Sequence, residues 1–179
     1  LQGLTPQDLQ SVFTDNQRAC ELITRMVRLP EEQYNERVVL KLLGFEGCTV
    51  DHLSPGLLAN AIYKNYISDR VIMAILRVDR VDKQYVLQNN HAALYAACFR
   101  GSLCVMNALL GFPDVTVNDV VFKNFDLLTT ACLAGTVEVV NSLIKYQDSS
   151  RNKVTLDSVT AENFQALVHA CTNNSSLEI

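Results

Sequence analysis

The sequence predicts an all-α protein, a repeat solenoid of about four to five stacked helix hairpins. Two observations predict this fold: a short apolar pattern recurs along the chain, and each copy has the spacing of a helix that ends at a turn. The alanines that mark the pattern are separated by 36, 34 and 39 residues. They are Ala61, Ala97, Ala131 and Ala170. Ala19-Cys20 indicates one earlier unit. Periods of about 20 to 50 residues are typical of stacked repeat proteins.

The first helix of each unit is predicted from the spacing of its apolar residues. Leu94, Ala97 and Cys98 follow the i, i+3, i+4 pattern that places side chains on one helix face. Four residues after each marker alanine stands a glycine or asparagine, which tolerates the left-handed conformation at a helix C-terminus. These residues are Asn65, Gly101, Gly135 and Asn174. We therefore expect the first helix to end there and His91 to lie in its first turn.

The second helix of each unit is predicted from a further apolar face. Its residues are Val105, Met106, Leu109 and Leu110 in one unit and Val139, Val140, Leu143 and Ile144 in the next. Hydroxyl residues, two of them followed by proline, predict helix starts at Thr5-Pro6, Ser54-Pro55, Ser68-Asp69 and Thr160. Long connections are expected at 44–53, 78–89, 111–123 and 147–159. Residues 42–51 resemble 109–118, so the loops belong to the repeat.

Composition excludes several classes of protein. Hydrophobic residues make up 49% of the chain and charged residues 19%, which is too apolar for a disordered segment. The net charge of −4 and the pI near 5.3 argue against a nucleic-acid partner, which needs a basic patch. No apolar run approaches the roughly 20 residues of a membrane span, so we expect no membrane insertion.

Six cysteines are present, but no pair has the C-x-x-C spacing of a metal site or redox motif. Several recur with the repeat, which favours small apolar core residues with free thiols. We therefore expect no metal, no cofactor and a reducing, cytoplasmic location. His91 and Cys98 could form a base–nucleophile pair, but the repeat already explains Cys98. No catalytic motif was found, so no enzymatic activity is expected.

The units resemble ankyrin repeats, whose pattern is T-P-L-H-x-A-A-x-x-G-H-x-x-x-V-x-x-L-L. The leucine, alanine, glycine and double-leucine positions are matched by Leu94, Ala97, Gly101, Leu109 and Leu110, and again by residues 128–144. The T-P-L-H turn is absent from every unit, so a plain α-solenoid stays open as an alternative. We expect residues 1–53 to form an N-terminal helical cap or divergent repeat. Residues 54–179 are expected to form an ankyrin-like array that continues beyond Ile179.

The resemblance implies a protein–protein interaction module, a scaffold or adaptor that binds another protein on its concave face and loop tips. The resemblance implies that the partner contacts residues of the first helix of each unit, just before the tight turn. His169 occupies the position that Ala96 and Thr130 hold in the two preceding units. The candidates are Tyr63, Lys64, Phe99, Arg100, Leu133, His169 and Asn173. Phe99 with Arg100 is the expected centre. The alternatives are a substrate-positioning repeat region of a larger enzyme and a secreted effector of an intracellular pathogen acting in the host cytosol.

Overall fold

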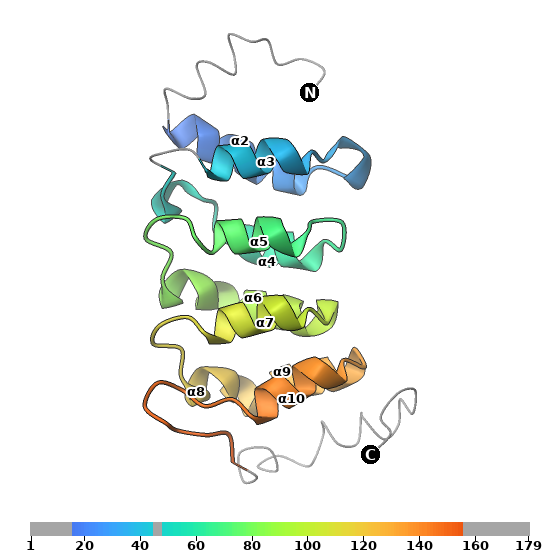
Figure 1. Cartoon of the computed structure of the whole chain (residues 1–179), viewed down its shortest axis with the longest axis vertical. Helices are drawn as coiled ribbons and strands as arrows, with labels where there is room; N and C mark the ends of the chain where they lie inside the picture. The colour runs from blue at the N-terminus through green and yellow to red at the C-terminus, as the bar shows by residue number, and fades with distance from the viewer. Residues whose placement is uncertain (1–15, 45–47, 156–179) are drawn as a thin grey trace. The chain divides into compact units, whose positions relative to one another are not determined.

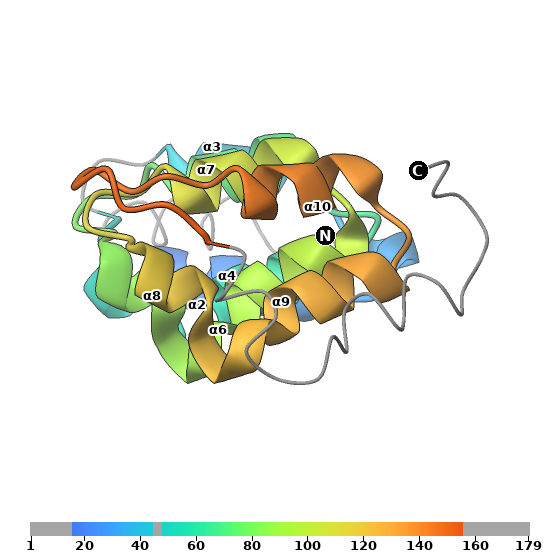
Figure 2. The same cartoon turned by 90° about the horizontal axis from the view of Figure 1, so that it is seen from below.

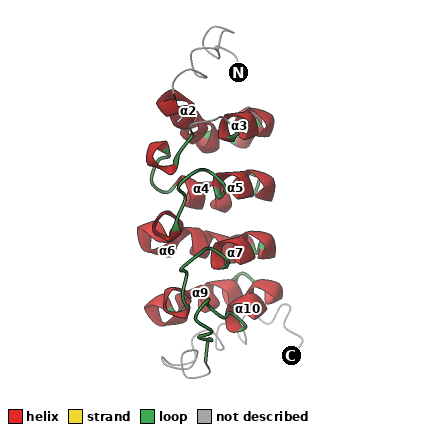
Figure 3. Cartoon of the chain, turned by 60° about the vertical axis from the view of Figure 1, so that its left-hand side comes forward, coloured by secondary structure: helices red, strands yellow, loops and turns green. Residues whose placement is uncertain are grey.

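A computed structural model describes residues 16–44 and 48–155 of the chain. Every regular element in these residues is a helix, and no strand is present among them, as expected for the all-α class (Figure 3). Two isolated β-bridges pair loop residues, Thr49 with Asp79 and Gln147 with Lys153. The helix starts predicted at Thr5-Pro6 and Thr160, and the turn predicted at Asn174, lie outside the described residues.

The chain divides into two compact units, with the boundary between Val81 and Asp82. The elements of the first unit are α2 (Asn16–Arg28), η1 (Glu31–Gln33), α3 (Glu36–Leu43), η2 (Val50–His52), α4 (Leu57–Tyr63) and α5 (Asp69–Ile75). Those of the second are α6 (Lys83–Arg100), α7 (Leu103–Leu110), α8 (Val117–Val120), α9 (Phe122–Leu133) and α10 (Val137–Ile144). The predicted separation of residues 1–53 from the array stays a prediction.

In the first unit, α2 packs on α3 and α4 packs on α5, so each pair forms a helix hairpin (Figure 1). The hairpins also pack on each other, α2 against α4 and α3 against α5. The core contains the small residues Ala19, Cys20 and Ala61 at 0% exposure. Small side chains at these positions allow the helices to approach closely.

The second unit has the same internal pairing. Helices α6 and α7 form one hairpin, α9 and α10 form the other, and α6 packs on α9 as α7 packs on α10. Figure 2 shows α6 and α9 on one side of this unit and α7 and α10 on the other. Leu94, Ala97 and Cys98 are fully buried, as the i, i+3, i+4 spacing predicts. The marker residue Ala131 is buried in the same way.

Two of the predicted left-handed turns are confirmed. Gly101 ends α6 with φ 72°, and Gly135 follows α9 with φ 70°. The prediction for Asn65 is wrong, because α4 ends two residues earlier and Lys64 has extended backbone angles (φ −84°, ψ 108°). The chain leaves α4 through that extended residue, so no left-handed residue is needed there.

The two helix starts predicted within the first unit differ in outcome. Ser68 is the N-cap residue of α5, as predicted. Ser54-Pro55 does not cap a helix, because α4 begins at Leu57 after Gly56, whose φ is 80°. The carbonyl of Ser54 accepts the N–H of Leu57 and closes a turn before the helix. The predicted helix start therefore lies two residues before the observed one.

The predicted long connections contain helical turns of their own. Thr49 precedes η2 and Thr116 precedes α8, and both have extended angles, with φ −123° and −115°. In both of these similar segments, therefore, an extended threonine precedes a short helical turn. The connection predicted at 78–89 is shorter than expected, because α6 begins at Lys83.

Helix α6 is interrupted by a run of unusual backbone angles. Asn89, Asn90 and His91 all have positive φ, at 55°, 55° and 62°, and Gln88 before them is extended. Right-handed helix resumes after this run. The expectation that His91 lies in the first turn of a regular helix is therefore wrong.

The apolar faces of the second helices are buried as predicted in α7, where Val105, Met106 and Leu109 are at 0% exposure. In α10 the prediction holds for Val139 and Leu143 but not for Ile144, which is 44% exposed. Ile144 is the last residue of α10, and a side chain at a helix end has fewer neighbours to cover it.

Candidate functional site

A large apolar residue is exposed near the end of each of three inner helices. Tyr63 in α4, Phe99 in α6 and Leu133 in α9 each follow the buried marker alanine by two residues. Their exposed fractions are 62%, 58% and 48%. Two residues along a helix is a rotation of about 200°, so burying the alanine turns this position toward solvent. The helix period thus accounts for the exposure at all three positions.

Within the second unit, Phe99 and Leu133 occupy the same position of two helices that pack against each other. The turns after these helices also meet, because the methyl carbon of Thr136 lies beside Gly101. The ends of α6 and α9 are therefore neighbours. Phe99 and Leu133 are therefore exposed near the ends of two neighbouring helices, and we call this pair of residues the inner-helix patch. Single exposed apolar residues are ordinary on protein surfaces, whereas large contiguous apolar patches mark interaction sites.

Arg100 follows Phe99 and is half-buried. It is the last residue of α6, where the partial negative charge of the helix C-terminus favours a cation. Its guanidinium supplies a positive charge at the end of the helix that carries Phe99. Arginine beside an aromatic side chain is a common pair at protein interfaces.

Lys64, in the first unit, has a structural contact of its own. Its ammonium donates hydrogen bonds to the carbonyl oxygen of Leu29 at 2.9 Å and to the hydroxyl of Tyr66 at 2.6 Å. It also lies 5.2 Å from the centre of the Tyr66 ring. The Tyr66 hydroxyl donates to the same carbonyl. These contacts fasten the residue after α4 to the chain just beyond α2.

Tyr34 extends this contact, with its ring centre 5.5 Å from that of Tyr66. Burial raises the pKa of Tyr34 to about 12, and the nearby Glu36 and Tyr66 add to the rise. The remaining predicted contacts, His169 and Asn173, lie outside the described residues.

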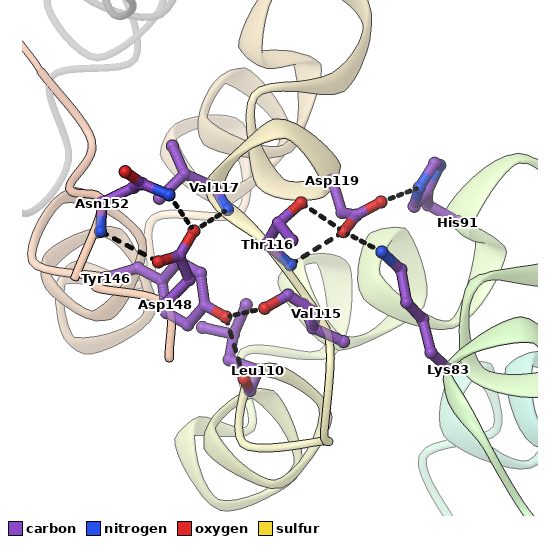
Figure 4. Close-up of polar contacts among 10 residues, drawn as sticks. All are labelled: Lys83, His91, Leu110, Val115, Thr116, Val117, Asp119, Tyr146, Asp148 and Asn152. Carbon is purple, nitrogen blue, oxygen red and sulfur yellow. Dashed lines mark hydrogen bonds and ion pairs between the residues drawn. The ribbon is translucent and has the colours of Figure 1, made fainter. Parts of the chain in front are cut away.

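The sequence analysis missed a polar network that fixes the loop between α7 and α9 (Figure 4). One oxygen of Asp119 accepts hydrogen bonds from the Thr116 N–H at 2.8 Å and the Thr116 hydroxyl at 2.7 Å. Lys83, at the start of α6, places its ammonium 2.7 Å from the same oxygen. The other oxygen lies 4.0 Å from Nε2 of His91. The spacing Thr-x-x-Asp before an apolar residue is the signal that predicts such a cap.

The pKa of Asp119 reflects two opposing effects. Burial alone would raise the pKa, but the hydrogen bonds from Lys83 and Thr116 outweigh it and hold the pKa below its ordinary value. Asp119 is therefore ionised at neutral pH and joins the beginning of α6 to the beginning of α8. The negative charge of Asp119 thus helps to hold the loop in place through its contact with Lys83.

A second carboxylate fixes the same loop from the other direction. Asp148 is buried (6% exposed) and accepts the backbone N–H groups of Val117 at 3.3 Å and Asn152 at 2.9 Å. Nearby, the hydroxyl of Tyr146 donates toward the carbonyl oxygens of Val115 at 2.8 Å and Leu110 at 3.2 Å. The segment after α10 therefore holds the backbone on both sides of Thr116.

A shallow groove of about 570 Å³ lies on the opposite side of the second unit, between α7 and α10. Its floor includes Leu103 and Leu110, and its rim carries Glu138 and Lys145. A 2.6 Å hydrogen bond from the Ser142 hydroxyl to the Asn107 side chain crosses it. The lining mixes apolar side chains with amides, hydroxyls and charges of both signs. The groove lacks the enclosed apolar lining typical of small-molecule sites.

The described residues hold no cluster of metal ligands, and the thiol of Cys98 is not an activated nucleophile. No group of three His, Cys, Asp or Glu side chains among them is placed to hold a metal ion. Burial, and then the neighbouring Cys132, raises the pKa of Cys98 to about 12, so this thiol is protonated at neutral pH. A protonated thiol is a poor nucleophile. His91 lies beside Asp119 instead.

None of the helices in the described ranges is both long and apolar enough to cross a membrane. No family model, curated protein or solved structure matches the chain.

Proposed function

We propose that the chain is an ankyrin-like repeat protein that binds another protein through the inner-helix patch. Two features support the repeat assignment. In each unit the first helices pack on first helices and the second helices pack on second helices. The glycine turns at Gly101 and Gly135 also occupy the family's glycine position. The absence of the T-P-L-H motif is offset by other contacts, since Asp119 and Asp148 hold the loop in the second unit.

The observation that carries the binding function is the exposure of Phe99 and Leu133. A buried side chain of either type would contribute about 1.5 to 3 kcal/mol to folding, yet about half of each side chain is exposed at equivalent positions. The partner would cover them with an apolar segment, and Arg100 would meet a carboxylate at its edge. The acidic net charge of −4 argues against nucleic acid as this partner.

The test is affinity capture with the full chain, followed by mass spectrometry and a direct affinity measurement. The double variant Phe99→Ser/Leu133→Ser should lose at least about tenfold in affinity for the captured protein, because hot-spot side chains contribute about 2 kcal/mol or more. Thermal denaturation should show a much smaller loss of stability than of affinity, since about half of each side chain is exposed. Phe99→Ala/Arg100→Ala should weaken binding in the same way.

The matched control is Ile144→Ser, which removes an apolar side chain of similar exposure (44%) from the end of α10. This variant should bind like the wild type. Equal binding by the Phe99/Leu133 variant and the wild type would refute the proposal. So would a loss of stability as large as the loss of binding.

We further propose that the protein works in a reducing compartment such as the cytoplasm. Five cysteines of the described residues are free thiols, and four of them are buried as packing residues. A thiol titration of the unfolded protein, isolated without reducing agent, should return all its cysteines as free thiols. A result of no free thiol would refute this location.

A further inference from the structure

Two cysteines meet in the interior of the first unit. Cys20 lies in α2 and is fully buried, and Cys48 lies just before η2 with 5% exposure. Their Sγ atoms are 3.0 Å apart. Helix α2 and η2 are in contact, and the two cysteines are 28 residues apart in the sequence. The repeat does not require this pairing, because Cys48 lies in a connection rather than in an inner helix.

The connection that carries Cys48 is held in place by backbone and charged contacts. The N–H of Val50 donates to the carbonyl oxygen of Asp79 at 3.0 Å. Arg80 and Asp51 form an ion pair with a nitrogen–oxygen distance of 2.5 Å. Both contacts join the residues after Cys48 to the chain that follows α5. Cys48 is therefore presented to α2 by an anchored segment.

We propose that Cys20 and Cys48 are a redox-sensitive dithiol, which a hydroperoxide oxidises to a disulfide that joins α2 to the segment before η2. A disulfide has a sulfur–sulfur bond of about 2.05 Å, so the two sulfurs need to approach by about 1 Å. A side-chain rotation together with a small shift of the connection supplies such a movement. Disulfides in reducing compartments are mostly transient and redox-sensing, which agrees with the proposed location.

The reaction has two steps. The Cys20 thiolate attacks one oxygen of the hydroperoxide, the O–O bond breaks, and Cys20 becomes a sulfenic acid with release of hydroxide or an alkoxide. The Cys48 sulfur then attacks the Cys20 sulfur, forms the S–S bond, and displaces the sulfenic oxygen as water, with the Cys48 proton. Overall, two thiols lose two electrons and two protons, and the peroxide is reduced.

The contacts and burial of the two thiols shift their pKa values in opposite directions. A hydrogen bond with the Cys48 thiol lowers the pKa of Cys20; burial opposes this, and a hydrogen bond with the Thr49 backbone adds to the lowering. The same contact and burial raise the pKa of Cys48. These directions agree with the proposed order, in which Cys20 reacts with peroxide and Cys48 resolves the sulfenic acid.

The other cysteines of the described residues lack this arrangement. Cys98 and Cys132 occupy equivalent positions of α6 and α9, but no sulfur–sulfur contact joins them and burial raises the pKa of both. Cys104 is exposed and is suited only to links between molecules. The Cys98/Cys132 pair therefore serves as an internal control in the same chain.

The experiment uses the full chain with Cys104→Ser and Cys171→Ser, which removes the exposed thiol and the one outside the described residues. The reduced protein is treated with hydrogen peroxide, denatured, alkylated and digested with trypsin. We expect the peptide 19–25 linked to the peptide 42–64, and an intact mass lower by about 2 Da. The oxidised protein should also melt at a temperature higher by an amount on the order of 10 °C, because the bond closes a long loop.

The order of steps is tested with single variants. Cys48→Ser keeps a hydroxyl beside Cys20, so peroxide should leave a sulfenic acid at Cys20 that dimedone captures. Cys20→Ser should give no dimedone adduct at Cys48. Alkylation of both Cys20 and Cys48 after peroxide treatment would overturn the proposal, as would a Cys98–Cys132 link formed in place of theirs. Alkylation and the disulfide link are both measured on the chain that keeps Cys20 and Cys48. The proposal can therefore be decided even if a single variant fails to fold.

Discussion

Thr136, before α10, fills the space that a side chain on Gly101, after α6, would need. A β-carbon built on Gly101 would lie 2.4 Å from Cγ2 of Thr136. The hydroxyl of Thr136 is meanwhile held by the carbonyl oxygen of Ala131 at 3.3 Å. The lack of space for a β-carbon at Gly101 shows that the two hairpin ends lie close together in the second unit. Gly135 has the same left-handed angles, but no described atom lies within 4 Å of its β-carbon position.

The two glycines should therefore respond differently to alanine. Gly135→Ala should lower the free energy of unfolding by about 1 to 2 kcal/mol, the cost of a left-handed residue with a β-carbon. Gly101→Ala should cost more, about 2 to 4 kcal/mol, because a steric clash adds to the same backbone cost. Chemical denaturation of both variants measures the difference. Equal losses would show that the contact with Thr136 has no energetic effect.

The clash can be relieved from its other side. Thr136→Ser removes Cγ2 but keeps the hydroxyl that donates to Ala131. The double variant Gly101→Ala/Thr136→Ser should therefore recover most of the excess loss of Gly101→Ala over Gly135→Ala. A double-mutant cycle that shows strict additivity would argue against a direct contact.

Asp119 should make the stability depend on pH. Its pKa is lower in the folded chain than the ordinary value of about 3.9. Its stabilising contribution is therefore fully present above about pH 5 and is lost as the pH falls through the folded pKa. Asp119→Asn should be less stable than the wild type at pH 7, and the difference should shrink toward pH 3. Urea denaturation at several pH values measures this.

Asp114→Asn is the matched control, since Asp114 is exposed and the asparagine tolerates its φ of 65°. Its stability should follow the wild-type pH curve. A constant difference between Asp119→Asn and the wild type across this range would contradict the role of the charge.

Tyr146→Phe should destabilise the protein by about 1 to 2 kcal/mol. The substitution keeps the ring but removes the hydroxyl that donates toward Val115 and Leu110. Two carbonyl oxygens in a partly buried loop would then lose a donor. Tyr95→Phe is the control, because Tyr95 is also half-buried and its hydroxyl forms no hydrogen bond with another described residue. Comparable losses from both substitutions would contradict this explanation.

Substitutions of Asn90 test the residues with positive φ inside α6. Because Asn90 is exposed, these substitutions leave the side-chain packing unaltered. Asn90→Gly should change stability by less than about 0.5 kcal/mol, since glycine adopts a φ of 55° freely. Asn90→Val should cost about 1 to 2 kcal/mol, because a β-branched side chain is strained there. Thermal denaturation compares the two. Equal stability would argue for a regular helix through this position.

The helix hairpins were predictable because their evidence is local. Leu94, Ala97 and Cys98 lie within five residues, and their spacing alone indicates the buried face. The turn glycines were predictable for the same reason. Asn65 was misjudged because asparagine tolerates left-handed angles without requiring them, and an extended Lys64 ends α4 equally well. A permissive residue predicts a turn less reliably than glycine does.

The candidate site was predictable only in part. The exposure of Phe99 and Leu133 follows from the helix period once Ala97 and Ala131 are known to be buried. The network around Asp119 and Asp148 was not predicted, because its partners are distant in the sequence. Lys83 lies 36 residues before Asp119, and only the folded chain brings them together. Cys20 and Cys48 are also far apart in the sequence, so their contact was not predicted either.

The segment after α10 also determines where the protein can be cut. Tyr146 and Asp148 lie beyond the last helical residue, Ile144, yet they hold the backbone that leads into α8. A fragment that ends at Ile144 would lack both residues. The backbone that leads into α8 would then lose the hydrogen bonds from Tyr146 and to Asp148. An expression boundary should therefore follow Asn152, whose N–H completes the contacts of Asp148. On the ribosome, the loop around Thr116 would likewise reach its final conformation only after about thirty more residues have been synthesised.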